Sequence, residues 1–257
     1  MQGRITLTRR GRVTVGVIAA LGIVSTGIAA KALTGPSEIP AEVNDTETPR
    51  AAPQRVGEDA VTTGIPGIGV KMSAAIPESA DQALVVSGEG PDSSTSHAIL
   101  YTWTGHEWRG GGAWPARNAV KGWTREHVMG DLRSPIGVFG LTAAGGQLAA
   151  PSGARVPYDH SELFVASGRG VEGEPLDGAF DYVVAIDYNR VAGTSPLDPA
   201  RPEGKAKGGG IWLHVDHGGG TQGCVALSRD HMRELLRSLD PGKNPVIVMG
   251  DGKTLAS

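Results

Sequence analysis

The sequence predicts a mainly β domain with one α-helix packed across it, and three features of its composition support this. The chain has 257 residues, of which 39% are hydrophobic, and this is enough to form a core. Glycine accounts for 39 residues, about twice its usual share. Aromatic residues make up only 5%. Such a composition is typical of short strands joined by many turns and excludes a helical bundle, while the single cysteine excludes a disulfide scaffold.

Short apolar runs bounded by turn residues predict the strands. Residues 82–87 and 97–103 are separated by a glycine- and serine-rich stretch, which predicts a hairpin. Five further strands are expected at residues 136–141, 162–166, 180–186, 211–215 and 246–249.

One helix is predicted to follow the cysteine. Ser228 is a suitable N-cap, and Asp240-Pro-Gly ends the helical pattern. The apolar residues between them recur at helical spacing, so that they share one face: Met232, Leu235, Leu236 and Leu239.

The N-terminus has the form of an export signal. Residues 1–12 contain four arginines and are predicted to be a cytoplasmic basic segment. Residues 13–30 are uncharged and would span about 27 Å as a helix, close to the thickness of the bilayer hydrocarbon. An uncleaved membrane anchor fits this length, whereas Ala30-Lys-Ala32 offers the small residues of a signal-peptide cleavage site. Both interpretations predict an extracytoplasmic location in the cell envelope, either membrane-anchored or secreted.

The next segment has the composition of a linker. Residues 31–79 are rich in proline and glycine and are predicted to be an extracytoplasmic tether. Residues 80–257 are predicted to be the folded domain. Residues 32–257 contain 19 basic and 27 acidic residues, a net charge of −8, and this balance argues against nucleic acid as a partner.

Cys224 is the first candidate for chemistry. A lone cysteine in an exported chain is either a small buried residue with a packing role or a free thiol with a chemical function. The glycine-rich stretch 218–223 precedes it directly and lets the backbone turn tightly, with N–H groups directed at one point. A nucleophile that attacks a carbonyl needs such donors for the oxyanion. This context favours a catalytic thiol over an ordinary glycine-rich hairpin.

His214 is the natural partner of this thiol. It ends an apolar run, ten residues before Cys224, and a loop through the glycines could bring imidazole and thiol together. A free thiol is only a few per cent ionised at neutral pH, and a neighbouring imidazole raises the reactive fraction. The pair therefore predicts nucleophilic catalysis by Cys224 with His214 as base.

Asp216 and His217 allow a competing metal-site interpretation. Two imidazoles and a carboxylate within four residues resemble part of a zinc site. However, positions 214 and 217 of a continuous strand face opposite ways, and no further ligand cluster completes the set. Asp216 and His217 are expected to be loop residues near the mouth of the site, and neither a metal nor another cofactor is predicted.

Three separate segments resemble one known family in the right order. Ile211-Trp-Leu-His214 followed by Thr221-Gln-Gly-Cys-Val225 resembles the signature of the L,D-transpeptidase catalytic domain, the YkuD-type fold. The stretches 125–139 and 180–189 resemble two other segments of this family. The resemblance covers about residues 80–250.

This resemblance implies a mixed-sheet, β-sandwich-like fold that acts on peptidoglycan stem peptides and is acylated by carbapenems. Cys224 would be the nucleophile and His214 the general base, oriented by a main-chain carbonyl. The N–H groups of Gly223 and Cys224 would line the oxyanion hole. Tyr188, Trp212 and His217 are further candidates for shaping the substrate groove, although core or loop roles are equally open.

Two positions depart from the family pattern. Gln222 stands where typical members have histidine, and Ala226 stands where many have arginine or asparagine. Neither departure removes a group that acyl transfer requires. The sequence therefore predicts an L,D-transpeptidase that forms a Cys224 thioester with a stem tetrapeptide and transfers it to an amine of another stem. An L,D-carboxypeptidase or endopeptidase at the same site, and a non-catalytic wall-binding module, remain alternatives.

Overall fold

The computed structural model describes residues 64–257. The predicted basic segment 1–12, the predicted anchor or signal peptide 13–30 and the first part of the predicted linker lie outside the described residues. Among residues 64–257, no helix has both the length and the apolar character needed to cross a membrane.

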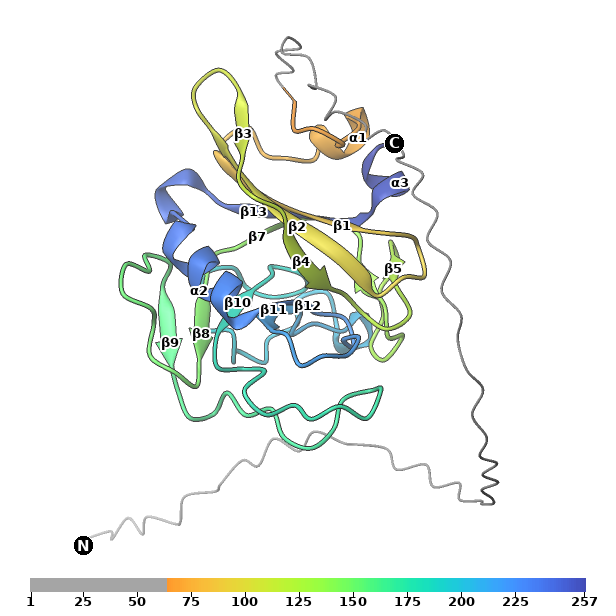
Figure 1. The fold of residues 1–257 in the computed structure, drawn as a ribbon, viewed down its shortest axis with the longest axis vertical. Coiled ribbons are helices and arrows are strands. Elements are labelled where there is room, and N and C mark those ends of the chain that lie inside the picture. Colours follow the sequence, from red (N-terminus) through yellow and green to blue (C-terminus); the bar gives the residue numbers. More distant parts are fainter. Residues whose placement is uncertain (1–63) are drawn as a thin grey trace, which may run out of the picture. The chain divides into compact units, whose positions relative to one another are not determined.

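One mixed sheet organises the described residues (Figure 1). Its eleven strands follow the order β7-β13-β1-β2-β4-β12-β11-β10-β8-β9, with β3 paired to β2, while β5 and β6 form a separate pair. The strands are β1 (Gln82–Gly88), β2 (Thr95–Trp103), β3 (Trp108–Gly110), β4 (Trp114–Arg117), β5 (Trp123–Thr124), β6 (Ser134–Pro135), β7 (Gly137–Gly140), β8 (Ala144–Gly146), β9 (Tyr158–His160), β10 (Val183–Ala185), β11 (Trp212–Val215), β12 (Val225–Leu227) and β13 (Val246–Asp251). The predicted mainly β, mixed-sheet fold is confirmed.

The strand β1 lies at the centre of one half of the sheet. It pairs antiparallel with β2, with Gln82 opposite Thr102, as the predicted hairpin requires. On its other side it pairs parallel with β13. Nearly every residue of β1 is buried, because a strand that is covered on both faces needs a continuous apolar run.

The predicted helix is α2 (Arg229–Ser238). The Ser228 hydroxyl accepts a hydrogen bond from the His231 N–H at 3.2 Å, which confirms the N-cap. The predicted apolar face is buried in the main core, at Met232, Leu235, Leu236 and Leu239. The helix contacts β11, so it supports the half of the sheet that carries the site residues.

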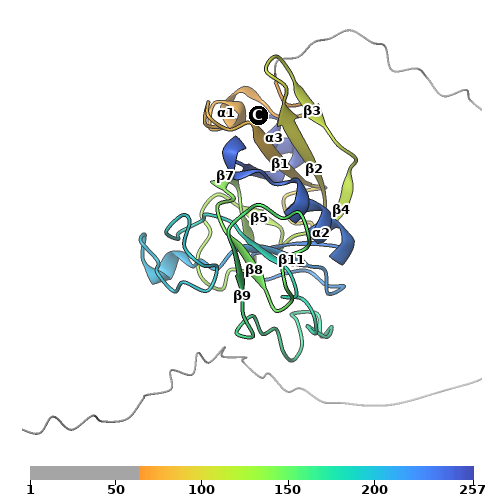
Figure 2. The same ribbon diagram turned by 90° about the vertical axis from the view of Figure 1, so that its left-hand side faces the viewer.

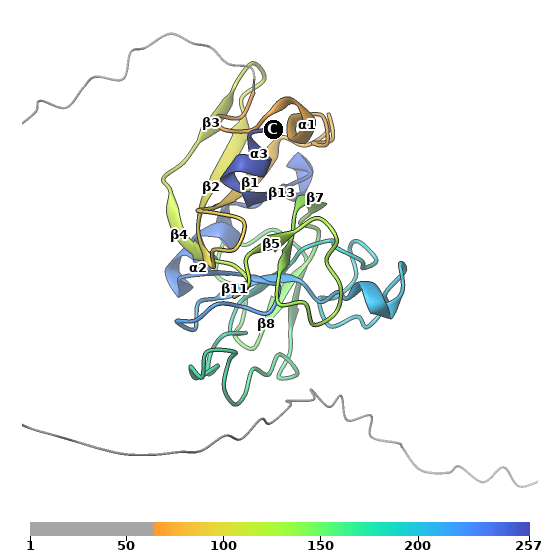
Figure 3. The same cartoon turned by 90° about the vertical axis from the view of Figure 1, so that its right-hand side faces the viewer.

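A second core lies on the other half of the domain, where α1 (Val70–Ser73) and α3 (Gly252–Leu255) are neighbours (Figures 2 and 3). Ile65 and Met72 are buried there with Leu255. The Gly69 N–H donates to the Leu255 carbonyl at 2.8 Å. The folded part thus begins before residue 80, since the last part of the predicted linker carries apolar side chains that reach this core.

The strand predicted at residues 162–166 is absent. Leu163 and Val165 are 76% and 57% exposed, and only Phe164 between them is buried. One buried side chain does not hold a strand in a sheet, and the edge is instead formed by β9, which pairs parallel with β8. Residues 161–179 form a long irregular segment, here called the covering loop.

Candidate active site

The parallel pairing of β11 and β12 brings the predicted nucleophile and base together. Leu213 lies opposite Val225, and His214 lies opposite Ala226. Cys224, directly before β12, is therefore beside Trp212 and on the same face of the sheet as His214. The glycine-rich loop 216–223 returns the chain from the end of β11 to this point, which explains the spacing of ten residues.

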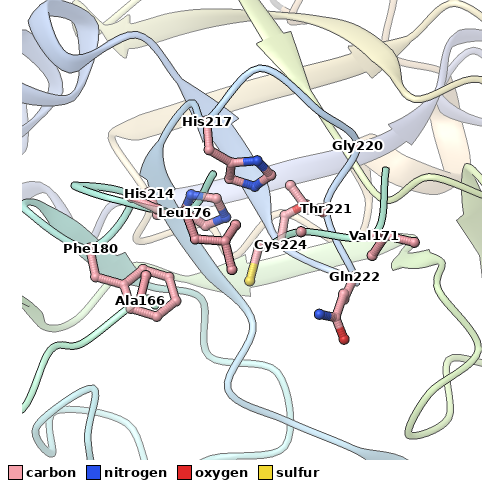
Figure 4. A pocket seen from close by; sticks show the side chains of 12 residues that line it. Ala166, Val171, Leu176, Phe180, His214, His217, Gly220, Thr221, Gln222 and Cys224 are labelled. Atoms are coloured by element: carbon pink, nitrogen blue, oxygen red, sulfur yellow. The ribbon is translucent and has the colours of Figure 1, made fainter. Parts of the chain in front are cut away.

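Cys224 and His214 line one pocket of about 190 Å³ (Figure 4). The sulfur of Cys224 and the ring of His214 both point into it. The remaining lining residues come from the covering loop, from Phe180 next to it and from the glycine-rich loop: Ala166, Gly170, Val171, Leu176, Ala179, Phe180, His217, Gly220, Thr221 and Gln222. The pocket is mostly apolar, so water is partly excluded around the thiol.

Burial keeps the two reactive groups neutral in the free protein. Cys224 is half-buried, and the dense packing around it raises the pKa of the thiol to about 11, although the Trp212 N–H donates to the sulfur at 3.4 Å and acts in the opposite direction. Burial also lowers the pKa of His214 to about 4. A neutral thiol therefore faces a neutral imidazole at pH 7.

A main-chain carbonyl fixes the tautomer of His214. Its Nδ1 lies 2.9 Å from the Val215 carbonyl oxygen. Because a carbonyl can only accept, Nδ1 carries the hydrogen and the lone pair is on Nε2. This is the form of the ring that can take a proton from a thiol.

Two hydroxyl groups hold the backbone at the nucleophile, and neither was predicted from the sequence. The Cys224 carbonyl accepts from Thr221 Oγ1 at 2.7 Å and from Ser134 Oγ at 3.2 Å. Gly223 is buried beneath this turn and is not part of the pocket lining. A Cβ atom there would stand 3.0 Å from Ile211, and its N–H donates to Thr221 Oγ1 at 3.3 Å.

His217 lies in the loop after β11 and lines the pocket, in agreement with its expected place in a loop near the mouth of the site. The strand β11 ends at Val215, so the alternation of a strand does not continue to residue 217. The two imidazoles are instead stacked, with ring centroids 5.5 Å apart and an angle of 12° between their planes. Asp216 turns elsewhere and pairs with Arg117, Nε to Oδ2 at 3.3 Å. Within residues 64–257, no group of three or more histidine, cysteine or acidic side chains is placed to hold a metal ion.

The other two groove candidates do not line the pocket. The Trp212 ring packs against Phe164 and Phe180, with centroid distances of 5.9 and 5.1 Å. Tyr188 is buried, and its hydroxyl lies 2.9 Å from the His127 carbonyl oxygen. Neither residue lines the pocket, so both have structural roles.

The covering loop supplies residues that the sequence did not single out. Glu174 Oε1 lies 2.9 Å from His217 Nδ1, and Glu172 Oε2 accepts from the Gly220 N–H at 2.6 Å. These contacts join the covering loop to the glycine-rich loop at the pocket. In the sequence both glutamates stand among glycines, as solvated loop residues do, and no local pattern distinguishes them.

The comparison with protein families agrees with the resemblance of the motifs. The model of the YkuD family, described as the L,D-transpeptidase catalytic domain, matches residues 114–248, which include His214 and Cys224. No curated protein matches the chain. Among solved structures, that of Bdellovibrio bacteriovorus Bd1075 is similar at 17% sequence identity and a TM-score of 0.40. That match covers 67% of this chain and 48% of Bd1075, so the chain spans about half the length of that protein.

Proposed function

The chain belongs to the L,D-transpeptidase catalytic domain family, and we propose that it cross-links peptidoglycan by forming a thioester between Cys224 and a stem tetrapeptide. The acyl group then passes to an amine of a second stem. One observation carries this proposal: Cys224 and His214 open into the same pocket, and the Val215 carbonyl leaves the His214 Nε2 lone pair free. No metal or other cofactor is needed for this chemistry.

The first step is an attack of sulfur on the carbonyl between the L-centre of a diamino acid and the terminal D-alanine. Because the thiol and imidazole are neutral at rest, the thiol proton moves to Nε2 of His214 as the C–S bond forms. The imidazolium then protonates the nitrogen of D-alanine as the C–N bond breaks. The Trp212 N–H, 3.4 Å from the sulfur, stabilises negative charge on it during the attack.

The oxyanion requires donors at the turn before β12. The backbone N–H groups of Gly223 and Cys224 are assigned to this role. In the free protein Gly223 is buried and its N–H donates to Thr221 Oγ1 at 3.3 Å, so the turn has to shift before this group can donate to a substrate oxygen. Thr221 and Ser134 hold the Cys224 carbonyl, which belongs to the next peptide, and thus fix the backbone directly after these donors.

The family acts on the cell wall, which implies an extracytoplasmic domain. The arginines of residues 1–12 and the uncharged run 13–30 fit this location, as an anchor or as an export signal. The partners are then stem peptides of the wall outside and, through the N-terminal segment, the membrane. The net charge of −8 over residues 32–257 argues against nucleic acid as a partner.

A carbapenem tests the nucleophile directly. Intact-mass analysis of the wild-type protein is expected to show one covalent adduct, which Cys224→Ala eliminates. Cys224→Ala removes the sulfur with a minimal change of volume, and exposed Ser167→Ala serves as a matched control that keeps the adduct. A folded wild-type protein without an adduct would identify a wall-binding module instead.

Incubation with a tetrapeptide donor, with and without an acceptor amine, then separates the possible enzymes. A transpeptidase forms the cross-linked product, and the amount of D-alanine that it releases rises with the acceptor concentration. Release of D-alanine at the same rate without acceptor, and no cross-linked product when acceptor is present, would identify a carboxypeptidase.

A further inference from the structure

A second imidazole faces the reactive pair and has no role in the mechanism above. His217 is buried, with a side chain that is 5% exposed, and it lines the pocket beside Cys224 and His214 (Figure 4). Its Nδ1 lies 2.9 Å from Glu174 Oε1, whose side chain is 12% exposed. Neither atom forms an aligned hydrogen bond with any described residue, the other one included, so their contact is a close approach of imidazole and carboxylate.

The chain is shaped to place the Glu174 carboxylate at this position. A Cβ atom on Gly170 would stand 1.9 Å from Glu174 Oε1, and one on Gly219 would stand 2.5 Å from the same atom. Neither glycine has a backbone conformation that other residues avoid, and a Cβ atom at either position would displace the carboxylate at the end of the Glu174 side chain. The two loops therefore form a cradle for one carboxylate, and this carboxylate orients one imidazole.

Transfer to an amine removes two protons from the attacking nitrogen, one more than the His214 imidazole can carry at one time. An alkyl amine with an ordinary pKa near 10.4 arrives as an ammonium ion and must lose a proton before it can attack. As the amine nitrogen bonds to the thioester carbonyl and the C–S bond breaks, a second proton must pass from nitrogen to sulfur. His214 carries the second proton, which leaves the first without an acceptor. Attack by water needs no such preliminary step.

We propose that His217, oriented by Glu174, takes this first proton from the incoming ammonium group. Nδ1 lies 2.9 Å from Glu174 Oε1, which leaves Nε2 as the ring nitrogen that takes a proton from a molecule in the pocket, and Glu174 stabilises the imidazolium that forms. The products are the amide, the regenerated Cys224 thiol and one proton on His217, which then passes to solvent. This role rests on the transpeptidase function proposed above and assigns a second base to it. Glu174 is a positioning residue.

The test measures how the acyl-enzyme is divided between amine and water. The full chain is acylated with the tetrapeptide donor, and cross-linked and hydrolysed products are quantified over a range of acceptor concentrations. His217→Gln is expected to lower the ratio of transfer to hydrolysis at least tenfold, because a general base typically contributes more than that. Glu174→Gln is expected to lower the ratio in the same direction but less. His160→Gln and Glu162→Gln, both exposed, serve as matched controls and keep the wild-type ratio.

A second readout distinguishes proton transfer from a structural effect. When the pH is raised toward the pKa of the amine, the acceptor arrives deprotonated, so the ratio for His217→Gln is expected to recover toward the wild-type value. The titratable groups that face His217 are His214, Glu174 and Cys224, and all three remain in that variant.

Two results would overturn the proposal. One is an unchanged ratio in His217→Gln and Glu174→Gln, and the other is an equal loss of acylation and transfer with no recovery at high pH. Carbapenem adduct formation is measured on every variant to confirm that the site is folded. Failure of the wild-type protein to form any adduct would contradict the proposed function itself, and is thereby distinguished from failure of this inference.

Discussion

His214 should make the stability of the protein depend on pH, and His214→Gln should remove that dependence. Burial lowers the pKa of this imidazole from 6.5 to about 4 in the folded protein. In the unfolded chain the pKa returns to its ordinary value. Between these two values the unfolded state binds a proton that the folded state does not bind.

The sign and size of the effect follow from this difference. Since the unfolded state binds more protons, the free energy of unfolding falls as the pH falls from about 6.5 to about 4. The loss attributable to His214 between pH 7 and pH 5 is about 2 kcal/mol. The side chain is 3% exposed, so solvent screening reduces this value little.

Urea unfolding at pH 7, 6 and 5 measures the effect. Other groups titrate in both proteins and contribute equally to both. The free energy of unfolding of His214→Gln is therefore subtracted from that of the wild type at each pH, and the change of this difference with pH is the effect of His214. The variant should become relatively more stable by about 2 kcal/mol as the pH falls. Exposed His160→Gln should show no such change. Parallel curves for wild type and His214→Gln would refute the buried, neutral state of His214 on which the mechanism depends.

Three other substitutions probe the elements around the site. Gly219→Ala should push the Glu174 carboxylate from its cradle, lowering the ratio of transfer to hydrolysis at a stability cost of about 1 kcal/mol, as measured by product analysis and urea unfolding. Asp187→Asn removes the counter-charge of buried Arg190 and should cost about 3 kcal/mol or more in urea, and a smaller loss would contradict the buried pair. Ser228→Ala removes the N-cap of α2 and should cost about 1 kcal/mol while carbapenem adduct formation stays at the wild-type level.

Long periodic segments were predictable because burial alone determines them. Two apolar runs form β1 and β13, and apolar residues at helical spacing up to Leu239 form one face of α2. These patterns place the hydrophobic side chains on defined faces and do not depend on contacts with distant parts of the chain. The three-residue strand β12 was not predicted. Its pairing with β11 depends on contacts between strands, and a run of three apolar residues does not distinguish a strand from a turn.

The site was predictable only where its residues adjoin such strands. His214 lies in β11 and Cys224 directly precedes β12, so their proximity followed from a plausible return of the loop. His217 was expected in a loop near the mouth of the site and lies there, but its stacking on His214 could not be predicted, because the backbone leaves the sheet after Val215 and follows no regular period. Glu174 could not be found at all, since the covering loop has no regular structure and reaches the pocket through tertiary contacts.

The departure at Gln222 can be understood from this arrangement. Members that resemble the family signature more closely carry a histidine two residues before the cysteine, whereas this chain has Gln222, whose amide cannot accept a proton at neutral pH. The structure places His217 on the same pocket as Gln222, five residues earlier in the glycine-rich loop. From this position the imidazole lies 2.9 Å from the Glu174 carboxylate. The pocket therefore contains two imidazoles despite the change in its motif, and the second carries its own carboxylate partner.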